Sequence, residues 1–184
     1  HADADLAAAV QTYLTLATGP NGLDAANPSP EQITALHTAG QTLAGRIQAY
    51  VNNPDLQLNT WTEGTAGENT AHYGAGFLFM TYFLDRFGEE ATQALVADPA
   101  NGLRSVEEVL QEQGLTNSLT GEPVTMVDVF ADWVIANYLG DADVADGRYE
   151  YNNYPDAPTV TTSTDYFYSC PVSNYSATVR QFGA

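Results

Sequence analysis

The chain has 184 residues, a length that suits one domain of ordinary size. It carries 23 acidic side chains against five basic ones, all of them arginines, so its formal net charge is −18. This charge repels phosphate groups, and we therefore expect neither nucleic acid nor an anionic membrane surface among its partners.

Helical patterns dominate the sequence as far as residue 139. Apolar residues recur at the spacing of one or two turns, and turn-forming Gly, Pro and Asn residues separate the segments. The expected helices cover residues 3–18, 30–51, 71–87 with a short helix following through 96, 105–114, and 125–139. The sequence therefore predicts a mainly α protein built as a helical bundle.

Three capping boxes mark expected helix starts. In each, Ser or Thr is followed three residues later by Gln, Glu or Asp, so that two backbone amides can be capped reciprocally. These boxes begin at Ser29, Ser105 and Thr125. The helix at 71–87 is apolar almost all round, which is typical of the buried centre of a bundle. Within it, Gly74 and Gly76 would allow a neighbouring backbone to come close.

The character of the chain changes after residue 139. An acidic, aromatic loop leads to residue 158, and residues 159–168 are rich in strand-forming Thr, Val, Tyr and Phe. We therefore divide the chain into a helical domain, residues 1–154, and an extended, β-prone tail, residues 155–184. The tail is expected to be the start of a β-domain or a strand exchanged with another copy.

Three segments together resemble a known family. They are residues 72–88 (HYGAGFLFMTYFLDRFG), 95–102 (LVADPANG) and 129–139 (VFADWVIANYL). In this order and spacing they resemble the C-terminal helical half of secreted zinc metallopeptidases of the immune-inhibitor-A-like and hyicolysin-like kind. The resemblance covers residues 45–154, and it implies a zincin-type helical subdomain in a secreted protein.

The catalytic motif of that family is missing. Such enzymes bind zinc through H-E-x-x-H, in which two histidines hold the metal and the glutamate acts as base. The chain contains no such motif, and Trp61 and Glu63 only faintly match a glutamate-bearing segment of the family. We therefore carry over no catalytic residue, and expect zinc only if a catalytic half exists outside this chain.

An acidic turn offers a candidate metal site. Asp141, Asp143, Asp146 and Glu150 supply hard oxygen ligands around Gly147, and calcium accepts such ligands in flexible geometry. The spacing differs from an EF-hand, because Ala145 stands at the fifth position and the glycine follows one place late. A solvated acidic loop is the other interpretation. His37 and His72 are expected to be structural histidines.

The tail contains the remaining candidate residues. Asn174 begins an Asn-Tyr-Ser glycosylation pattern, and Cys170 is either a small buried residue or a partner for a cysteine outside the chain. An extended segment can satisfy its backbone by adding a strand to another copy. The residues that we assign to this assembly strand are Thr159, Val160, Tyr166, Phe167 and Tyr168.

These observations favour an extracellular, non-catalytic structural or assembly protein on a degenerate metallopeptidase-like scaffold, able to form filaments. Its expected partners are further copies of itself or the remainder of a precursor. The alternative is the C-terminal fragment of an active secreted zinc metallopeptidase whose catalytic helix lies outside this chain.

Overall fold

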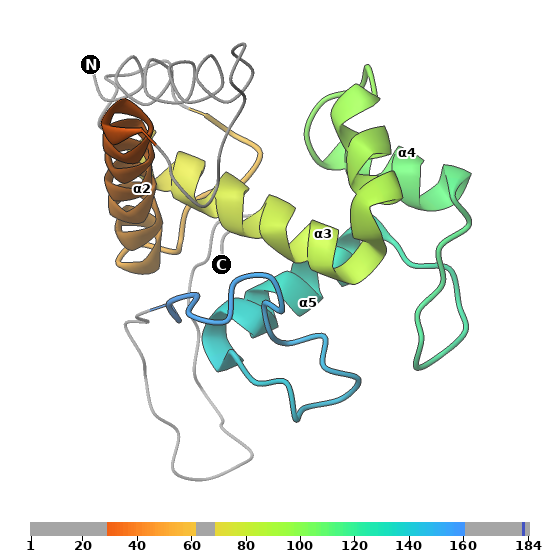
Figure 1. Ribbon diagram of the computed structural model, residues 1–184. Coiled ribbons are helices and arrows are strands. Elements are labelled where there is room, and N and C mark those ends of the chain that lie inside the picture. Colours follow the sequence, from red (N-terminus) through yellow and green to blue (C-terminus); the bar gives the residue numbers. More distant parts are fainter. Residues whose placement is uncertain (1–28, 62–68, 161–181, 183–184) are drawn as a thin grey trace, which may run out of the picture.

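The protein is mainly helical, as the sequence predicted. The computed structural model describes residues 29–61, 69–160 and 182. Within these ranges the chain forms four helices and no strand; its one β-bridge joins Thr116 to Pro123. The helices are α2 (Pro30–Val51), α3 (Thr70–Ala97), α4 (Leu103–Glu112) and α5 (Met126–Leu139) (Figure 1). The helix expected at 3–18 lies outside the described residues.

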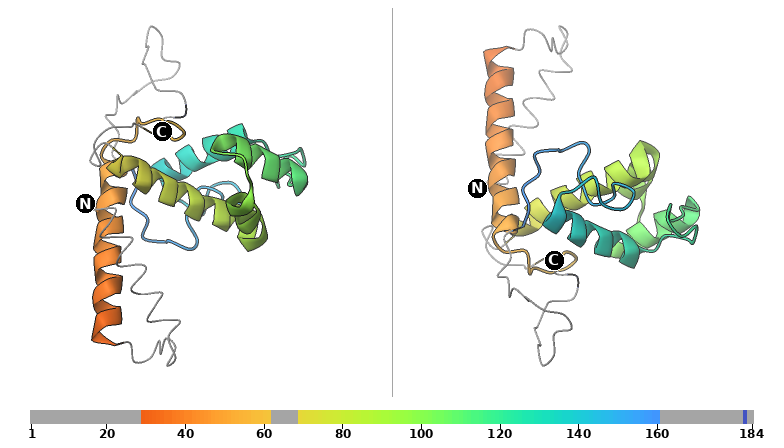
Figure 2. Two further views of the ribbon diagram at one scale, coloured as in Figure 1. Left: turned by 90° about the horizontal axis from the view of Figure 1, so that it is seen from above. Right: turned by 90° about the horizontal axis from the view of Figure 1, so that it is seen from below.

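Helix α2 begins at the predicted capping box. The Ser29 hydroxyl accepts the amide of Gln32 at 3.2 Å, and the Gln32 side chain accepts the amide of Ser29 at 2.7 Å. The helix stands to one side of the other three, and its C-terminal end meets the N-terminal half of α3 (Figures 1 and 2). Among the described side chains of α2, those at this end, from Leu43 to Val51, supply the core around α3.

Gly74 makes that crossing possible. A Cβ atom added at Gly74 would lie 2.2 Å from the carbonyl oxygen of Arg46 and 2.9 Å from the Cα of Ile47, both backbone atoms. Gly76 differs, because a Cβ atom there would have no neighbour within 4 Å. The expected close approach is thus confirmed at Gly74 and wrong at Gly76.

Helix α3 changes direction where the sequence places the end of one helix and the start of another. Gly88 has φ 81° and ψ −178°, a conformation outside the helical region that glycine tolerates because it lacks a Cβ. The second half of α3 consequently turns away from the axis of the first half (Figure 1). This turn brings the following loop and α4 next to α3.

The capping box at Thr125 is confirmed, whereas the one at Ser105 is wrong. Thr125 and Asp128 cap each other's backbone at the start of α5. Helix α4 instead begins at Leu103, so Ser105 lies inside its first turn and is buried. Glu108, the expected partner of Ser105, instead accepts from the Arg104 side chain at 2.7 Å. Its neighbour Glu107 accepts the amide of Met126 at 2.7 Å and so caps α5.

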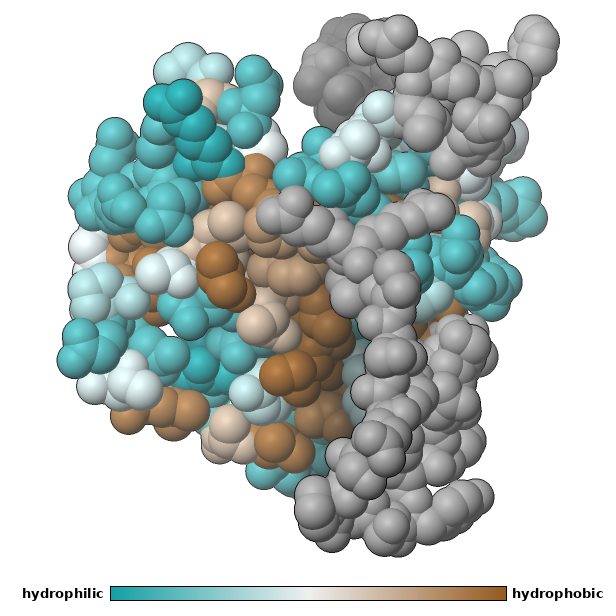
Figure 3. All heavy atoms as spheres, turned by 180° about the vertical axis from the view of Figure 1, so that it is seen from behind, coloured by the Kyte–Doolittle hydropathy of each residue, from teal (hydrophilic) through white to brown (hydrophobic). Residues whose placement is uncertain are grey.

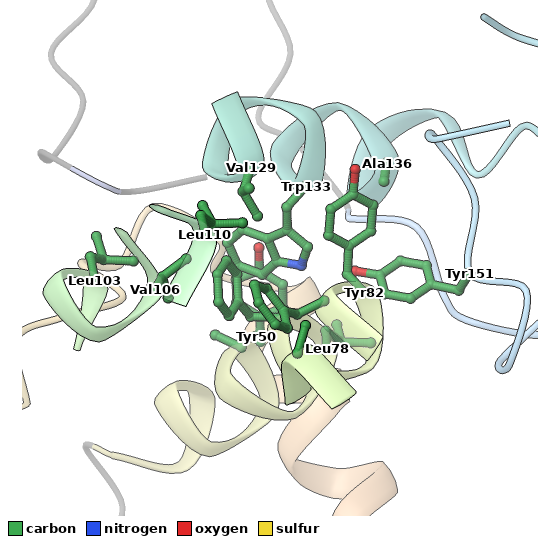
Figure 4. Packing of buried hydrophobic residues seen from close by; sticks show 14 of the residues in the cluster. Tyr50, Leu78, Tyr82, Leu103, Val106, Leu110, Val129, Trp133, Ala136 and Tyr151 are labelled. Carbon is green, nitrogen blue, oxygen red and sulfur yellow. The ribbon is translucent and has the colours of Figure 1, made fainter. Parts of the chain in front are cut away.

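The core lies between α3 and α5, with Trp133 near its centre (Figure 4). The indole of Trp133 stacks on Tyr50 with ring centroids 5.8 Å apart, and Phe79 meets it edge-on at 5.5 Å. Leu78, Tyr82 and these three aromatic residues are all nearly inaccessible to solvent. Aromatic burial from α2, α3 and α5 therefore holds the helices together.

One polar group is built into this core. Asn137 is 1% exposed; its amide nitrogen donates to the Tyr50 hydroxyl at 3.0 Å, and the Tyr151 hydroxyl donates to its oxygen at 2.6 Å. Burial raises the pKa of both tyrosines, so both phenols stay neutral at physiological pH. These bonds fix the rotation of α5 against α2 and tie the loop after α5 to the core.

Candidate functional site

The acidic loop after α5 folds back on itself. Helix α5 ends at Gly140 in the left-handed conformation, and the amide of Asp141 donates to the carbonyl of Tyr149 at 2.9 Å. A further tight turn forms around Ala145, which has φ 59°, and Gly147. The loop is thereby closed at its base, and this closure brings Arg148 back against α5.

Arg148 is the buried centre of this region. Its side chain is only 4% exposed, which is unusual for a charged residue. Its Nε donates to Asp146 at 2.6 Å and one terminal nitrogen donates to the same carboxylate at 2.9 Å, a bidentate pair. The other terminal nitrogen donates to Asp132 on α5 at 3.0 Å.

Two side chains from the loop before α5 complete the arrangement. Asn117 and Ser118 accept from the same Arg148 nitrogen at 3.0 and 3.1 Å. The Ser118 hydroxyl also donates to Asp146. We call these five residues the Arg148 cluster: Asn117, Ser118, Asp132, Asp146 and Arg148. It joins three segments that are separate in the sequence.

The electrostatics of the cluster keep its ion pairs charged. The hydrogen bonds from Arg148, together with the Ser118 hydroxyl and Arg86 at 3.7 Å, hold the pKa of Asp146 well below its usual range. The same carboxylate raises the pKa of Arg148. Since all three guanidinium nitrogens donate within the protein, we assign the cluster a structural task, which is to hold the loop on α5.

The structure does not bring the four predicted calcium ligands together. Asp146 faces Arg148, and the Asp141 carboxylate accepts the amide of Asp143 at 2.9 Å in a local turn. Glu150 is half-buried elsewhere on the loop. In the described ranges, no three His, Cys, Asp or Glu side chains are grouped closely enough to hold a metal ion.

The two histidines expected to be structural differ in their surroundings. His72 is 8% exposed and packs against Trp61, with ring centroids 5.5 Å apart. His37 is exposed on α2. In the part of the chain that the structure describes, neither histidine belongs to a group of three His, Cys, Asp or Glu side chains that could hold a metal ion.

The tail returns to α5 at two described points. The amide of Val160 donates to the carbonyl of Asn137 at 2.9 Å. The ring of Phe182 meets Phe130 edge-on at 5.3 Å, and its carbonyl accepts the amide of Leu58 at 3.1 Å. Thr159 is exposed beside Val160. The predicted assembly residues Tyr166, Phe167 and Tyr168, the glycosylation candidate Asn174 and Cys170 all lie outside the described residues.

A second feature of α5 is its outward face. Four exposed residues at helical spacing, none of them charged, lie along it, and we call them the outer stripe: Val127, Ala131, Ile135 and Tyr138. Val127 is 59% exposed, Tyr138 54% and Ile135 38%. Figure 3, which views the molecule from behind and so from the side of α5, shows a broad apolar area in the middle of this face.

The apolar pattern of residues 126–139 could have indicated the outer stripe, but it is compatible with two different surroundings of the helix. Residues 126–139 are apolar around most of the helix, a pattern that is typical of a helix surrounded by protein. In the structure Trp133, Val129 and Ala136 face the core, while the opposite side meets solvent. The same pattern therefore also describes a helix with one face available for a partner.

Comparison with known proteins adds no relative to this description. No protein-family model matches the chain, and no curated protein and no solved structure is significantly similar to it. None of the helices in the described ranges is long and apolar enough to cross a membrane. The class that the structure supports is accordingly a mainly helical protein with an apolar, solvent-facing stripe on α5.

Proposed function

We propose that this protein is a non-catalytic structural or assembly component that associates with further copies of itself through the outer stripe of α5. The observation that carries the proposal is the exposure of Val127, Ile135 and Tyr138 on one side of α5, with the exposed Asp128 at its edge. A contiguous apolar area on a protein surface is typical of an interaction site. Burial of such a face against another copy would be favoured by the hydrophobic effect.

The partner in this proposal is a second copy, because the stripe can pair with itself. Two α5 helices packed face to face around a two-fold axis would bury the same residues on both sides. The net charge of −18 opposes contact between copies through acidic surface. This charge therefore favours contact through an uncharged stripe.

The tail offers a second contact for longer assemblies. Residues 159–184 include the assembly strand proposed from the sequence, and both Val160 and Phe182 lie against α5. A strand supplied by one copy and accepted by the next would give a head-to-tail contact, which generates a filament when it does not close. The same proposal places the protein outside the cell, on the ground of its composition. It also includes descent from a zinc metallopeptidase that has lost its metal-binding motif, on the ground of the resemblance over residues 45–154.

The test is sedimentation velocity of Ile135→Lys beside Ile33→Lys as a matched control. Both change an exposed helical isoleucine, on α5 and on α2 respectively, and both leave a net charge of −17 (−18 + 1). We expect the wild type and Ile33→Lys to associate with a common concentration dependence, and Ile135→Lys to remain monomeric. Equal association of both variants would show that the stripe is not the contact.

The alternative is that the stripe contacts the rest of a larger zinc peptidase. That function predicts a wild-type chain that stays monomeric at all concentrations, together with an H-E-x-x-H motif encoded upstream of this segment. A separately produced upstream segment would then bind the wild type and fail to bind Ile135→Lys. Sedimentation of the chain alone therefore discriminates between the two functions.

A further inference from the structure

A cavity of about 410 Å³ lies between the two halves of α3, the start of α4 and the loop at 58–61. The change of direction at Gly88 brings these walls together (Figure 1). Its described lining is mainly apolar and includes Phe79, Met80, Leu103 and Val106. Both its volume and its lining are in the range of sites that bind small molecules.

One wall of the cavity carries polar groups that lack partners. Ser105 lines it and is 4% exposed, and no described residue accepts or donates a hydrogen bond at its hydroxyl. A buried polar group without a partner is rare in folded proteins.

The first turn of α4 adds further donors beside Ser105. Gly102 stands at the N-cap, and within the described part of the chain no side chain caps this helix. The amides of Leu103 and Arg104 stand in the first turn, where the helix supplies no carbonyl partner, so they favour an oxygen acceptor. The amide of Ser105 donates to the carbonyl of Gly102 at 3.1 Å. The Ser105 hydroxyl and the uncapped start of α4 are two independent features of the same wall, and both could bind an oxygen atom of a ligand.

The charge around the cavity limits the chemical class of the ligand that carries this oxygen. The Asp98 carboxylate lies on its rim, fixed by the amide of Ala100 at 2.7 Å, and Asn59 and Asn101 are the other polar rim residues. With Asp98 nearby and a net charge of −18, a carboxylate or phosphate ligand would be repelled. An alcohol or carbonyl oxygen accepts the same hydrogen bonds without a charge.

We infer that this cavity binds a small neutral amphiphile, an apolar molecule with one alcohol or carbonyl oxygen. The oxygen is placed at Ser105 and the first amides of α4, and the apolar body lies against Phe79 and Met80. Desolvation of the apolar body drives binding, and the oxygen sets the orientation of the ligand. This site is separate from the outer stripe and does not depend on the assembly function.

The protein contains its own reporter for this site. Trp61 lines the cavity and is 45% exposed, and its ring is held by contacts with His72 and, edge-on at 4.7 Å, with Tyr73. The second of the two tryptophans, Trp133, is 1% exposed in the core. A change in tryptophan emission on ligand binding is therefore expected from Trp61.

The experiment is a titration of the full chain with 1-octanol, followed by tryptophan emission and by displacement of the neutral dye Nile red. Octanoate, which has the same chain length and a carboxylate, is the matched ligand. We expect 1-octanol to shift the emission and displace the dye, and octanoate to bind at least tenfold more weakly. Trp61→Phe should abolish the emission change and leave displacement intact.

Two glycines provide the matched variants. Gly76 lines the cavity and Gly45 lies on α2 outside it, and a Cβ atom at either position meets no atom within 4 Å. Gly76→Leu should fill the cavity and weaken 1-octanol at least tenfold, Gly76→Ala should weaken it less, and Gly45→Leu should leave it unchanged. Ser105→Ala should weaken 1-octanol several-fold. Circular dichroism of each variant checks its fold.

Several outcomes would overturn the assignment. Equal affinity of the folded Gly76→Leu and Gly45→Leu variants would place the ligand elsewhere, and loss of binding in Ile135→Lys would place it on the outer stripe. Equal binding of octanoate and 1-octanol would contradict the neutral-ligand class. Unchanged affinity in Ser105→Ala would remove the oxygen contact on which the orientation depends.

Discussion

Helix α5 has two apolar sides with different surroundings. On the inner side, Trp133 and Ala136 are each 1% exposed and pack against α3 and the end of α2. On the outer side, Val127 and Tyr138 are more than half exposed. The two sides have a similar apolar composition. Their energetic roles differ, because the hydrophobic effect acts only on surface that is removed from water. The inner side stabilises the fold, and the outer side is available for association.

The largest effect is expected from the inner side. Trp133→Ala removes an indole that stacks on Tyr50 and meets Phe79, and it should lower the free energy of unfolding by about 3–5 kcal/mol. Val127→Ala on the outer side should change it by less than about 0.5 kcal/mol. Urea denaturation of both variants measures the difference. Similar losses in the two variants would contradict the division of α5 into two sides.

The next largest loss of stability is expected where α2 crosses α3, because this crossing places the end of α2 against the inner side of α5. Gly74→Ala places a methyl group against the backbone of Arg46, which cannot yield as a side chain would, so we expect a loss of about 3 kcal/mol. Gly76→Ala should instead stabilise the helix by about 0.5–1 kcal/mol, since the new methyl group meets open space. Thermal unfolding should therefore shift in opposite directions for the two glycines.

The Arg148 cluster tests whether the loop after α5 helps to hold the inner side. Arg148→Met removes the cation beside Asp132 and leaves Asp146 with only the more distant Arg86, and we expect a loss of about 2–3 kcal/mol. Arg104→Met is the control, because its ion pair with Glu108 is exposed and should contribute only about 0.3–0.5 kcal/mol. Equal small losses would show that the cluster does not support the fold.

The pH dependence of the same cluster follows from Asp146. Its native pKa lies below the unfolded value of about 3.9, so its contribution is fully present above that value and is lost as the pH falls towards the native pKa. Asp146→Asn should destabilise by about 1–2 kcal/mol at pH 7 and by a smaller amount at pH 3, where the unfolded carboxyl is mostly protonated while the native one is still ionised. Melting temperatures of wild type and variant at both pH values measure this; a constant difference would contradict it.

The smallest effect on stability is expected on the outer stripe itself. Ile135→Lys should change the free energy of unfolding of the monomer by less than about 1 kcal/mol, because the side chain is already 38% exposed. Urea denaturation at a concentration below the onset of association isolates this quantity. A larger loss would mean that the stripe also supports the fold of the single chain.

Much of the helical framework could be predicted from the sequence, because its signals act over a few residues. The capping boxes at Ser29 and Thr125 and the break at Gly88 depend on contacts within one turn, and all three are confirmed. Ser105 shows the limit of such signals. Its pattern matches a capping box, but packing places the start of α4 two residues earlier and buries the serine.

The candidate sites depended on longer distances. Arg148 bonds to Asp132, 16 residues away, and to Asn117, 31 residues away, so no local pattern predicted the cluster. The predicted calcium ligands share a short segment, yet Asp146 is paired with Arg148. A one-dimensional cluster of carboxylates does not show which of them already has a cation.

The sequence by itself thus determined the mainly helical class of the fold and the starts of α2 and α5, since caps, glycine breaks and apolar periodicity are local. Only the tertiary structure decided which apolar face of α5 is covered, what Glu107 caps and where a cavity with an unpartnered Ser105 remains. Each of these depends on how elements far apart in the chain pack against one another. Packing selects among several locally acceptable arrangements the one that buries Trp133 together with Tyr50 and Tyr82.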